Sequence, residues 1–553
     1  MKNYYTLVGA LTLIISVTTN KLAAQQASTH INTKPKLVVG IVVDQMRYDY
    51  LPRFWSKYGQ GGFKRMVSEG FIAKNNHFNY VPTKTAAGHT SVYTGSTPKT
   101  HGIIGNDWYD KTEKRMVYCT EDATVNSVGT TSDAGKMSPR RMLSSTMTDQ
   151  LKLATVSKGK VIGVSLKDRA SILPAGSAAD GAYWFEGGHD GNWITSTYYV
   201  QQLPEWVQKF NDSDAAEKYK KTWNTLYDIK TYTESLPDDN KFEGAFRGEK
   251  APVFPHELKK LWKDNGEFSL LKSVPYGNSL TVDFAEAAVN GENLGKDDIT
   301  DFLAVSFSST DYVGHQFGVS AKETEDTYLR LDNDLARLFS FLDEKVGKGN
   351  YTVFLTADHA AVEVPSYLES LEIPGGYENG KDFYNKVNTF LKDTFGSDKL
   401  IENISNDQIF LNHEELKDLK LSSAEVETAI ANEIVSYKNI AEAYTGTAMR
   451  NQQFTKGLAA KLQMGYNFKR SGDVLFALEP GYITSSGRTG TTHGSGYIYD
   501  THTPLLFFGK GIKHGETAQL TQIPDIAATI CTLLGISFPS GEAGQPITQA
   551  LEN

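Results

Sequence analysis

Four stretches of the chain are continuous apolar runs without the alternation that marks a half-exposed strand. They span residues 36–44, 160–166, 301–308 and 351–359. Runs of this length indicate strands that are buried on both faces, as in a parallel sheet covered by helices. Two later stretches, residues 473–478 and 504–508, are predicted to be strands of the same core.

Helical patterns occur between these predicted strands. Residues 141–157 and 278–289 are predicted helices, and residues 523–534 form a closing one. A long amphipathic helix is predicted where apolar side chains recur every three or four residues, at Tyr328, Leu331, Leu335, Leu338 and Leu342. Strands that alternate with helices predict an α/β fold with a doubly wound, mostly parallel central sheet flanked by helices.

Two polar stretches interrupt this pattern and are predicted to be insertions. They cover about residues 203–275 and 365–467, within a catalytic domain that spans residues 36–534. The first insertion is too rich in aromatic residues to be disordered. Chain length and a hydrophobic content of 40% are sufficient for one large core.

The first 24 residues have the pattern of a secretory signal peptide, with Lys2 before a short apolar run and small residues near Ala24. We therefore expect a periplasmic or secreted protein. Cys119 and Cys531 are the two cysteines of the mature chain, and the sequence leaves open whether they form a disulfide or are separately buried.

The net charge of −9 provides no excess of cations to cover a nucleic-acid backbone. We therefore expect no nucleic-acid partner, and we also expect no membrane partner and no obligate protein partner. An anionic substrate would need a local cationic site, and metal ions would provide one in an acidic protein.

Charged and metal-ligating side chains follow the predicted core strands. In open α/β sheets the carboxyl ends of the strands form the edge where ligands bind. Taken singly, an Asp after a strand is usually a turn or cap residue. Three Asp carboxylates close together at one edge would repel one another unless cations neutralised them. The residues concerned are Asp44, Lys167, Arg169, Asp311, His315, Asp358 and His359, and the glycine-rich loop 485–496 adds His493.

Mixed Asp and His ligands suit zinc, or less specifically another divalent first-row metal. The number of ligands fits two ions. One ion would take Asp311, His315 and His493. The other would take Asp44, Asp358, His359 and the Thr85 oxygen. Two ions about 4 Å apart recur in enzymes that displace groups in line at phosphorus.

Thr85 lies where a turn at Pro82 gives way to a short predicted helix that ends at Gly95. A hydroxyl at or next to the N-cap meets unpaired backbone N–H groups and the positive end of the helix dipole. On this stretch alone a helix cap is the simpler interpretation. Beside a two-metal site, the same hydroxyl could serve as a nucleophile.

Several motifs occur in order at these positions and resemble the alkaline phosphatase superfamily, in the branch with a Thr nucleophile that includes type I nucleotide pyrophosphatase/phosphodiesterases. More closely, the chain resembles the phosphate-irrepressible periplasmic alkaline phosphatases of Gram-negative bacteria. The motifs are Asp44-Gln-Met-Arg-Tyr-Asp-Tyr, Pro82-Thr-Lys-Thr85, Ser308-Ser-Thr-Asp311-Tyr-Val-Gly-His315, Thr356-Ala-Asp358-His359, Thr492-His493-Gly and Ile523-Pro-Asp-Ile-Ala.

The resemblance implies an alkaline phosphatase that binds two Zn²⁺ ions and hydrolyses small-molecule phosphate monoesters. It implies that Thr85 forms a phosphothreonine intermediate, and that Asn106, Lys167 and Arg169 bind the phosphoryl oxygens. The chain has Thr where better-known alkaline phosphatases have Ser. It shows no clear ligand set for their magnesium site and lacks the Cys-x-Pro-x-Arg segment of sulfatases.

Two other functions remain open from the sequence. A nucleotide pyrophosphatase/phosphodiesterase on the same core would need a nucleobase slot, for which Phe78, Tyr80 and Tyr109 are candidates. A non-catalytic zinc-stabilised binding protein would use Thr85 only as a helix cap.

Overall fold

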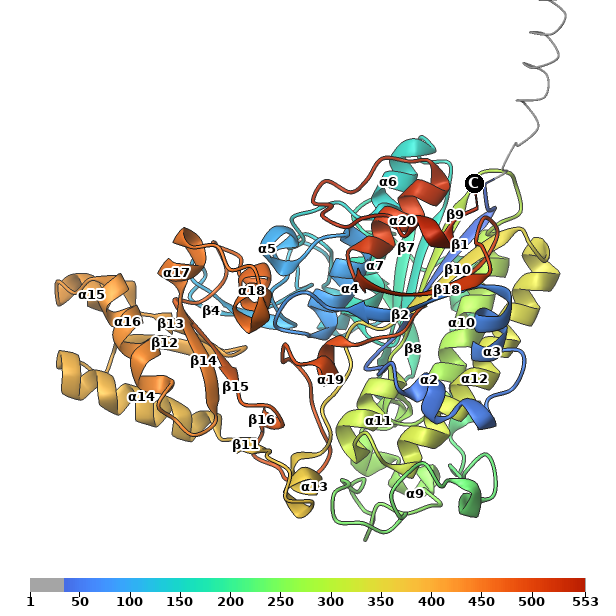
Figure 1. The fold of residues 1–553 in the computed structure, drawn as a ribbon. Helices are drawn as coiled ribbons and strands as arrows, with labels where there is room; N and C mark the ends of the chain where they lie inside the picture. The colour runs from blue at the N-terminus through green and yellow to red at the C-terminus, as the bar shows by residue number, and fades with distance from the viewer. Residues whose placement is uncertain (1–33, 553) are drawn as a thin grey trace, which may run out of the picture.

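A computed structural model describes residues 34–552, and its centre is a ten-stranded sheet with the order β18-β2-β17-β10-β1-β9-β6-β7-β8-β5 (Figure 1). The five strands from β10 to β7 run parallel, whereas β17 and β8 pair antiparallel on either side of them. The predicted fold class, a mostly parallel α/β sheet, is confirmed. The strands are β1 (Leu37–Val43), β2 (Phe71–His77), β5 (Ser127–Val128), β6 (Val161–Ser165), β7 (Gly181–Gly187), β8 (Asn192–Ser196), β9 (Asp301–Phe307), β10 (Tyr351–Thr356), β17 (Leu505–Gly509) and β18 (Gly515–Gln522).

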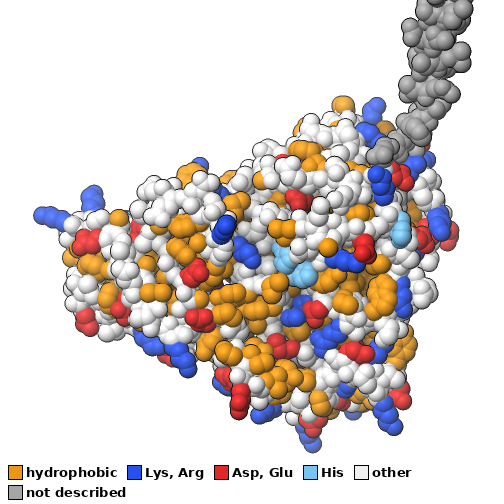
Figure 2. Space-filling model, in the orientation of Figure 1, with side chains coloured by type: hydrophobic (Ala, Val, Ile, Leu, Met, Phe, Trp, Pro, Cys, Tyr) orange, Lys and Arg blue, Asp and Glu red, His pale blue; other side chains and the backbone are white. Residues whose placement is uncertain are grey.

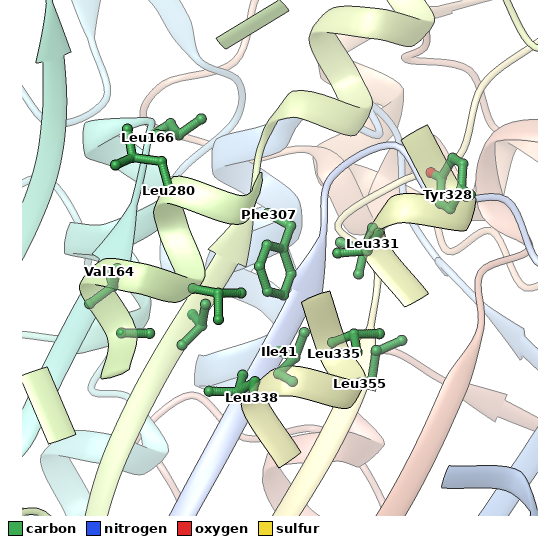
Figure 3. Close-up of a cluster of buried hydrophobic side chains, with 14 of the residues drawn as sticks. Ile41, Val164, Leu166, Leu280, Phe307, Tyr328, Leu331, Leu335, Leu338 and Leu355 are labelled. Atoms are coloured by element: carbon green, nitrogen blue, oxygen red, sulfur yellow. The ribbon is translucent and has the colours of Figure 1, made fainter. Parts of the chain in front are cut away.

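Alternate residues of β1 face two separate cores, one on each side of the sheet. Val39 and Ile41 belong to the core covered by α10 (Tyr276–Glu292) and α12 (Lys322–Leu342). Figure 3 shows Leu331, Leu335 and Leu338 of α12 packed over Ile41, as the repeat in the sequence predicts. Every residue of β1 is buried, which explains the continuous apolar run.

The opposite face of the sheet is covered by α4 (Thr85–Thr94), α6 (Met147–Ala154) and α20 (Asp525–Leu534). Val38 and Val42 of β1 pack there. Helix α6 begins six residues later than predicted from residue 141, because Thr146 and Asp149 form a reciprocal capping box that fixes its first turn.

The first polar stretch, from about residue 203 to 275, contains α8 (Glu205–Asn211), α9 (Leu258–Leu261) and short 3₁₀ segments. Tyr227 is exposed, but several of its other aromatic side chains are buried. Trp223, Tyr232 and Phe246 are buried in the same core as α10 and α12, so this stretch extends the main core.

The second polar stretch forms a lobe beside the main body (Figure 1). The lobe contains a four-stranded sheet of order β12-β13-β15-β14. The prediction that residues 473–478 return to the central sheet is wrong, because β15 (Val474–Leu478) pairs with β13 and β14. A buried strand in a small second core has the same continuous run of apolar residues as a strand in the main sheet. The other elements of the lobe and its connections are β11 (Gly376–Glu378), α13 (Pro365–Ser370), α14 (Gly380–Phe395), β12 (Ile401–Ser405), β13 (Gln408–Leu411), α15 (His413–Asp418), α16 (Ser423–Ile434), β14 (Ile440–Thr445), α17 (Gly446–Asn451), α18 (Gly457–Gly465) and β16 (Tyr482–Thr484).

Cys119 and Cys531 are both free and buried. They lie in different hydrophobic clusters, so each is a small apolar residue of its own core. In the described part of the chain, no helix combines the length and the apolar character needed to cross a membrane. The predicted signal peptide lies outside the described residues, and the predicted domain boundaries stay predictions.

Helix α4 packs with its backbone directly on the end of strand β10. A Cβ atom at Gly88 would lie 2.1 Å from the backbone oxygen of Asp358. We expect Gly88→Ala to lower the free energy of unfolding by about 1–3 kcal/mol, the usual range for overpacking, in urea titrations followed by circular dichroism.

The matched control is Gly380→Ala at the start of α14, where the nearest atom to a new Cβ is 3.9 Å away. This variant should unfold at the wild-type urea concentration or slightly above it. If Gly88→Ala were as stable as the control, α4 would not be held against β10 in the way described.

Candidate metal and phosphoryl site

The carboxyl ends of the parallel strands bring the predicted site residues together at one sheet edge. Asp44 directly follows β1, and Lys167 follows β6 after one residue. Strand β9 leads into α11 (Ser309–Phe317), which carries Asp311 and His315. Strand β10 ends just before Asp358 and His359. Adjacent parallel strands end at the same edge, so residues hundreds of positions apart in sequence become neighbours.

Asp311, His315 and His493 form one group, in which one possible ligand atom from each residue lies within 4.8 Å of the others. His315 Nε2 is 3.1 Å and His493 Nε2 is 3.7 Å from Asp311 Oδ1. His493 reaches this group from the loop after β16. The loop is shaped by Asp500, whose Oδ2 accepts hydrogen bonds from the backbone N–H groups of Gly494 and Ser495.

Asp44, Asp358 and His359 form a second group of the same kind, and all three side chains are buried. His359 Nε2 lies 3.4 Å from both Asp44 Oδ1 and Asp358 Oδ2. Burial raises the pKa of Asp358 to about 7, and that of Asp44 rises because of burial and of the neighbouring Asp311 and Asp358. The two sequence-predicted ligand groups are therefore brought together as two clusters.

All three imidazoles present the same nitrogen to the carboxylates. Nδ1 of His315, His359 and His493 donates to the backbone oxygen of Thr491, Ala360 and Thr83, at 2.7, 3.1 and 2.7 Å respectively. Each Nε2 then faces a carboxylate, and although burial lowers the pKa of His315, Asp311 raises it overall. Burial lowers the pKa of His359 and His493, which keeps these rings neutral.

This arrangement fits divalent cations. Carboxylate oxygens of the Asp residues and imidazole nitrogens of the His residues converge in each group. Within the described chain, Asp44 Oδ1 and Asp358 Oδ2 are buried without a hydrogen-bond partner. Buried carboxylates without partners cost several kcal/mol unless a cation compensates them. Three imidazole nitrogens with three carboxylates form a donor set that suits zinc.

Lys167 bridges the two groups. Its Nζ donates to Asp44 Oδ2 and to Asp311 Oδ2, each at 2.6 Å. Both carboxylates raise the pKa of this ammonium group, against the opposing effect of its burial. Lys167 is thus fully charged and lies between the two clusters.

Thr85 is the first residue of α4 and does not cap it. The N-cap is Lys84, which makes no side-chain cap hydrogen bond. Thr85 Oγ1 lies 3.4 Å from His359 Nε2 and is buried. The Ala86 N–H in the first turn of α4 donates instead to Asn106 Oδ1 at 2.9 Å. Asn106 Nδ2 is therefore the amide atom left to donate to a ligand.

Arg169 lies in the first turn of α7 (Asp168–Ala175), two residues after Lys167. Its Nη1 donates to the Tyr118 hydroxyl at 3.0 Å, and that hydroxyl donates to Asp168 Oδ1 at 2.8 Å. Arg169 is therefore held in place by the β4 strand (Arg115–Tyr118).

Sequence reasoning missed Gln45, which connects the two groups. Its backbone N–H donates to Asp358 Oδ1, and its Nε2 donates to Asp311 Oδ1 at 2.7 Å. The sequence marks Gln45 only by its position directly after Asp44, which is not a distinctive pattern. His89 also lies next to the site, with its Nδ1 3.3 Å from Asp358 Oδ2. His101 and His502 contact other parts of the chain.

The residues proposed for a nucleobase slot do not form one. Phe78 and Tyr80 are fully buried in the core on the α4 side of the sheet. The Tyr109 hydroxyl donates to Glu402 Oε2 at 2.8 Å. None of these three rings is free to stack on a nucleobase.

The fold is that of the alkaline phosphatase superfamily. Residues 38–503 match the profile of the type I phosphodiesterase / nucleotide pyrophosphatase family. The chain belongs to this family.

Three relatives cover nearly all of the chain. Alkaline phosphatase PafA of Elizabethkingia meningoseptica is 47% identical over 97% of this chain and 98% of its own. A protein named calcium-transporting ATPase, from Myroides odoratus, is 46% identical over 94% and 95%. Alkaline phosphatase PhoV of Synechococcus elongatus is 46% identical over 94% and 93%.

Solved structures agree with these relatives. The crystal structure of wild-type PafA has a TM-score of 0.91 at 48% identity and covers 94% of this chain and 99% of that one. A second PafA structure carries substitutions of one Thr, one Asn, one Lys and one Arg, in that order. Murine ectonucleotide pyrophosphatase / phosphodiesterase 5 shares the fold alone, with a TM-score of 0.51 at 14% identity, over 93% of this chain and 100% of that one.

Proposed function

We propose that this protein is a metal-dependent alkaline phosphatase that hydrolyses small-molecule phosphate monoesters to an alcohol and inorganic phosphate. The observation that carries the proposal is the Thr85 hydroxyl at the N-terminus of α4, which lies beside His359 of the second carboxylate–histidine group. The names of the relatives PafA and PhoV support it.

In the proposed reaction, Thr85 Oγ1 forms a bond to phosphorus as the bond to the alcohol oxygen breaks. The oxygen of a water molecule then bonds to phosphorus as the Thr85 Oγ1–phosphorus bond breaks; inorganic phosphate leaves and the Thr85 oxygen regains a proton from that water. In this proposal, the Thr85 N–H at the start of α4 and Asn106 Nδ2 would hold the non-bridging oxygens during both steps. Thr85 is buried, which limits access of water to the first step.

Two Zn²⁺ ions fit the two groups in this proposal. Asp311, His315 and His493 would hold one, and Asp44, Asp358, His359 and Thr85 would hold the other. When bound, such ions supply Lewis-acid chemistry: their charge favours the alkoxide over the hydroxyl and stabilises the departing oxygen.

Lys167 and Arg169 are the basis for preferring monoesters. With divalent ions neutralising Asp44 and Asp311, the Lys167 ammonium is free to pair with a phosphoryl oxygen. A monoester presents a terminal dianion that Lys167 and the fork of Arg169 can neutralise together, whereas a diester carries a second substituent there. The PafA variant with substituted Thr, Asn, Lys and Arg supports the choice of Thr85, Asn106, Lys167 and Arg169.

We further propose that residues 1–24 are a signal peptide and that the protein is periplasmic or secreted, on the pattern of the sequence. N-terminal sequencing of the exported protein would start after about residue 24, and a chain that kept Met1 would contradict this.

The role of Thr85 is tested by Thr85→Ala. We expect kcat for p-nitrophenyl phosphate to fall at least about 10³-fold, as for loss of other nucleophiles, because no hydroxyl remains to accept the phosphoryl group. Thr94→Ala, in the same helix, removes a hydroxyl that binds only Thr90 O and Ser96 Oγ and should keep turnover. Undiminished turnover by a folded, metal-loaded Thr85→Ala variant would disprove the proposed intermediate.

The preference for monoesters is tested by Arg169→Ala. We expect kcat/KM for p-nitrophenyl phosphate to fall about 10²-fold, the usual effect of removing one transition-state donor. The fall for bis-p-nitrophenyl phosphate should be at most a tenth as large. Arg247→Ala, an exposed arginine of the first insertion, is the control and should change neither. Equal losses on the two substrates would show that Arg169 positions any phosphoryl group.

A further inference from the structure

A cavity of about 490 Å³ lies between the second insertion and the loop that carries His493. On one side, the lobe contributes the β12–β13 hairpin and residues of α14 and β15, and the adjoining β16 contributes further residues. On the other side, the main body contributes Lys84 and residues 492–496. Figure 2 shows hydrophobic side chains gathered where this lobe meets the main body.

The cavity adjoins both segments that carry the proposed phosphoryl contacts. Lys84 precedes Thr85, and its Nζ donates to the His493 backbone oxygen at 2.8 Å. The hairpin turn, Asn406-Asp407, has positive φ at both residues. Asn406 Nδ2 donates to the backbone oxygen of Asp107, next to Asn106, at 2.7 Å.

The expected direction of the departing alcohol leads to the same cavity. Thr85 Oγ1 lies against His359, in one of the two groups. In an in-line displacement the departing oxygen is opposite the attacking one, so it faces the other group. That group includes His493, which also lines the cavity.

The lining of the cavity has a definite chemistry. Phe383, Phe476 and Leu478 provide apolar surface. Among the described residues, three polar atoms of the lining are buried without a hydrogen-bond partner: Asn403 Oδ1, Ser405 Oγ and Asp500 Oδ1. An apolar pocket with a few convergent polar groups is the usual form of a small-molecule site.

Charge further restricts the ligand. The lining includes the carboxylates of Glu378, Glu402, Asp407 and Asp500. Its one described lysine, Lys84, donates to the His493 backbone oxygen, and its charge also stabilises the carboxylates of Asp407 and Asp500, so the lining keeps an excess of negative charge. Burial raises the pKa of Asp500 to about 6, which indicates a carboxylate that a cation would stabilise. The cavity therefore favours an apolar ring that carries a positively charged hydrogen-bond donor.

We propose that this cavity binds the organic group of the phosphate ester and selects aromatic alcohols that carry an amino group. This inference rests on the proposed phosphatase function and names the substrate class of the same site. The acidic hairpin turn and Asp500 would pair with the ammonium group, and Phe383 and Phe476 would contact the ring.

Two esters of matched size that differ in charge test the proposal. Tyramine phosphate carries an aminoethyl group on the ring, and 4-propylphenyl phosphate carries a propyl group there. We expect wild-type kcat/KM to be about tenfold higher for tyramine phosphate, equivalent to about 1.4 kcal/mol. Asp407→Asn should reduce this preference at least about threefold, since Asn keeps the shape of the turn and removes the charge.

A second variant tests the volume of the cavity. Ser405→Trp should lower kcat/KM for both aryl esters about tenfold or more relative to methyl phosphate, which is too small to need the cavity. Ser436→Trp makes the same substitution at an exposed position of the same insertion and should leave every ratio at its wild-type value.

Equal kcat/KM for the two aryl esters, unaffected by Asp407→Asn, would overturn the proposal, as would a Ser405→Trp variant that kept the wild-type aryl-to-methyl ratio. These results differ from failure of the proposed function, in which the wild type would not hydrolyse methyl phosphate either.

Discussion

Three buried carboxylates lie together at one edge of the central sheet, those of Asp44, Asp311 and Asp358. Neighbouring side chains donate hydrogen bonds that partly compensate this concentration of negative charge. Lys167 contacts two of them, and Gln45 donates to the third and to Asp311. These donors do not satisfy every oxygen. The three imidazoles add further acceptors, since each Nδ1–H is bound to the backbone. Such a cluster is stable only with additional positive charge.

The requirement for charge connects the fold to the chemistry. Parallel strands deliver the carboxylates to one edge, and Gly88 allows α4 to approach β10 closely enough to place Thr85 beside His359. Asn106 binds the N-terminal amide of that helix and so links the helix of the proposed nucleophile to a proposed phosphoryl contact. Cations that neutralise the carboxylates would also release Lys167 toward a phosphate. In this proposal, structural stability and substrate binding would depend on the same ions.

The sequence predicted the elements with the strongest patterns. The buried strands before Asp44, Lys167, Asp311 and Asp358 appear as β1, β6, β9 and β10, because continuous apolar runs have few other solutions. Residues 473–478 have an equal pattern but pair within the lobe, since a periodicity cannot say which core buries a strand.

The finer parts of the site depend on side-chain geometry that spacing does not encode. Thr85 was predicted at or next to the N-cap, and only the structure shows that Asn106, 21 residues away, binds the helix amide. Gln45 was overlooked because a glutamine after a strand has no distinctive pattern. The roles of Asn106 and Arg169 came from family resemblance, and the contact of Arg169 with Tyr118 required the fold.

The central claim, that the buried carboxylates and imidazoles hold two divalent ions, is tested most directly by metal analysis of the purified native protein. Inductively coupled plasma mass spectrometry should find two zinc ions per chain, and one fewer in Asp311→Asn and in Asp358→Asn, each of which removes a charge from one group. A fully active wild-type chain that contained no stoichiometric divalent metal would contradict the account.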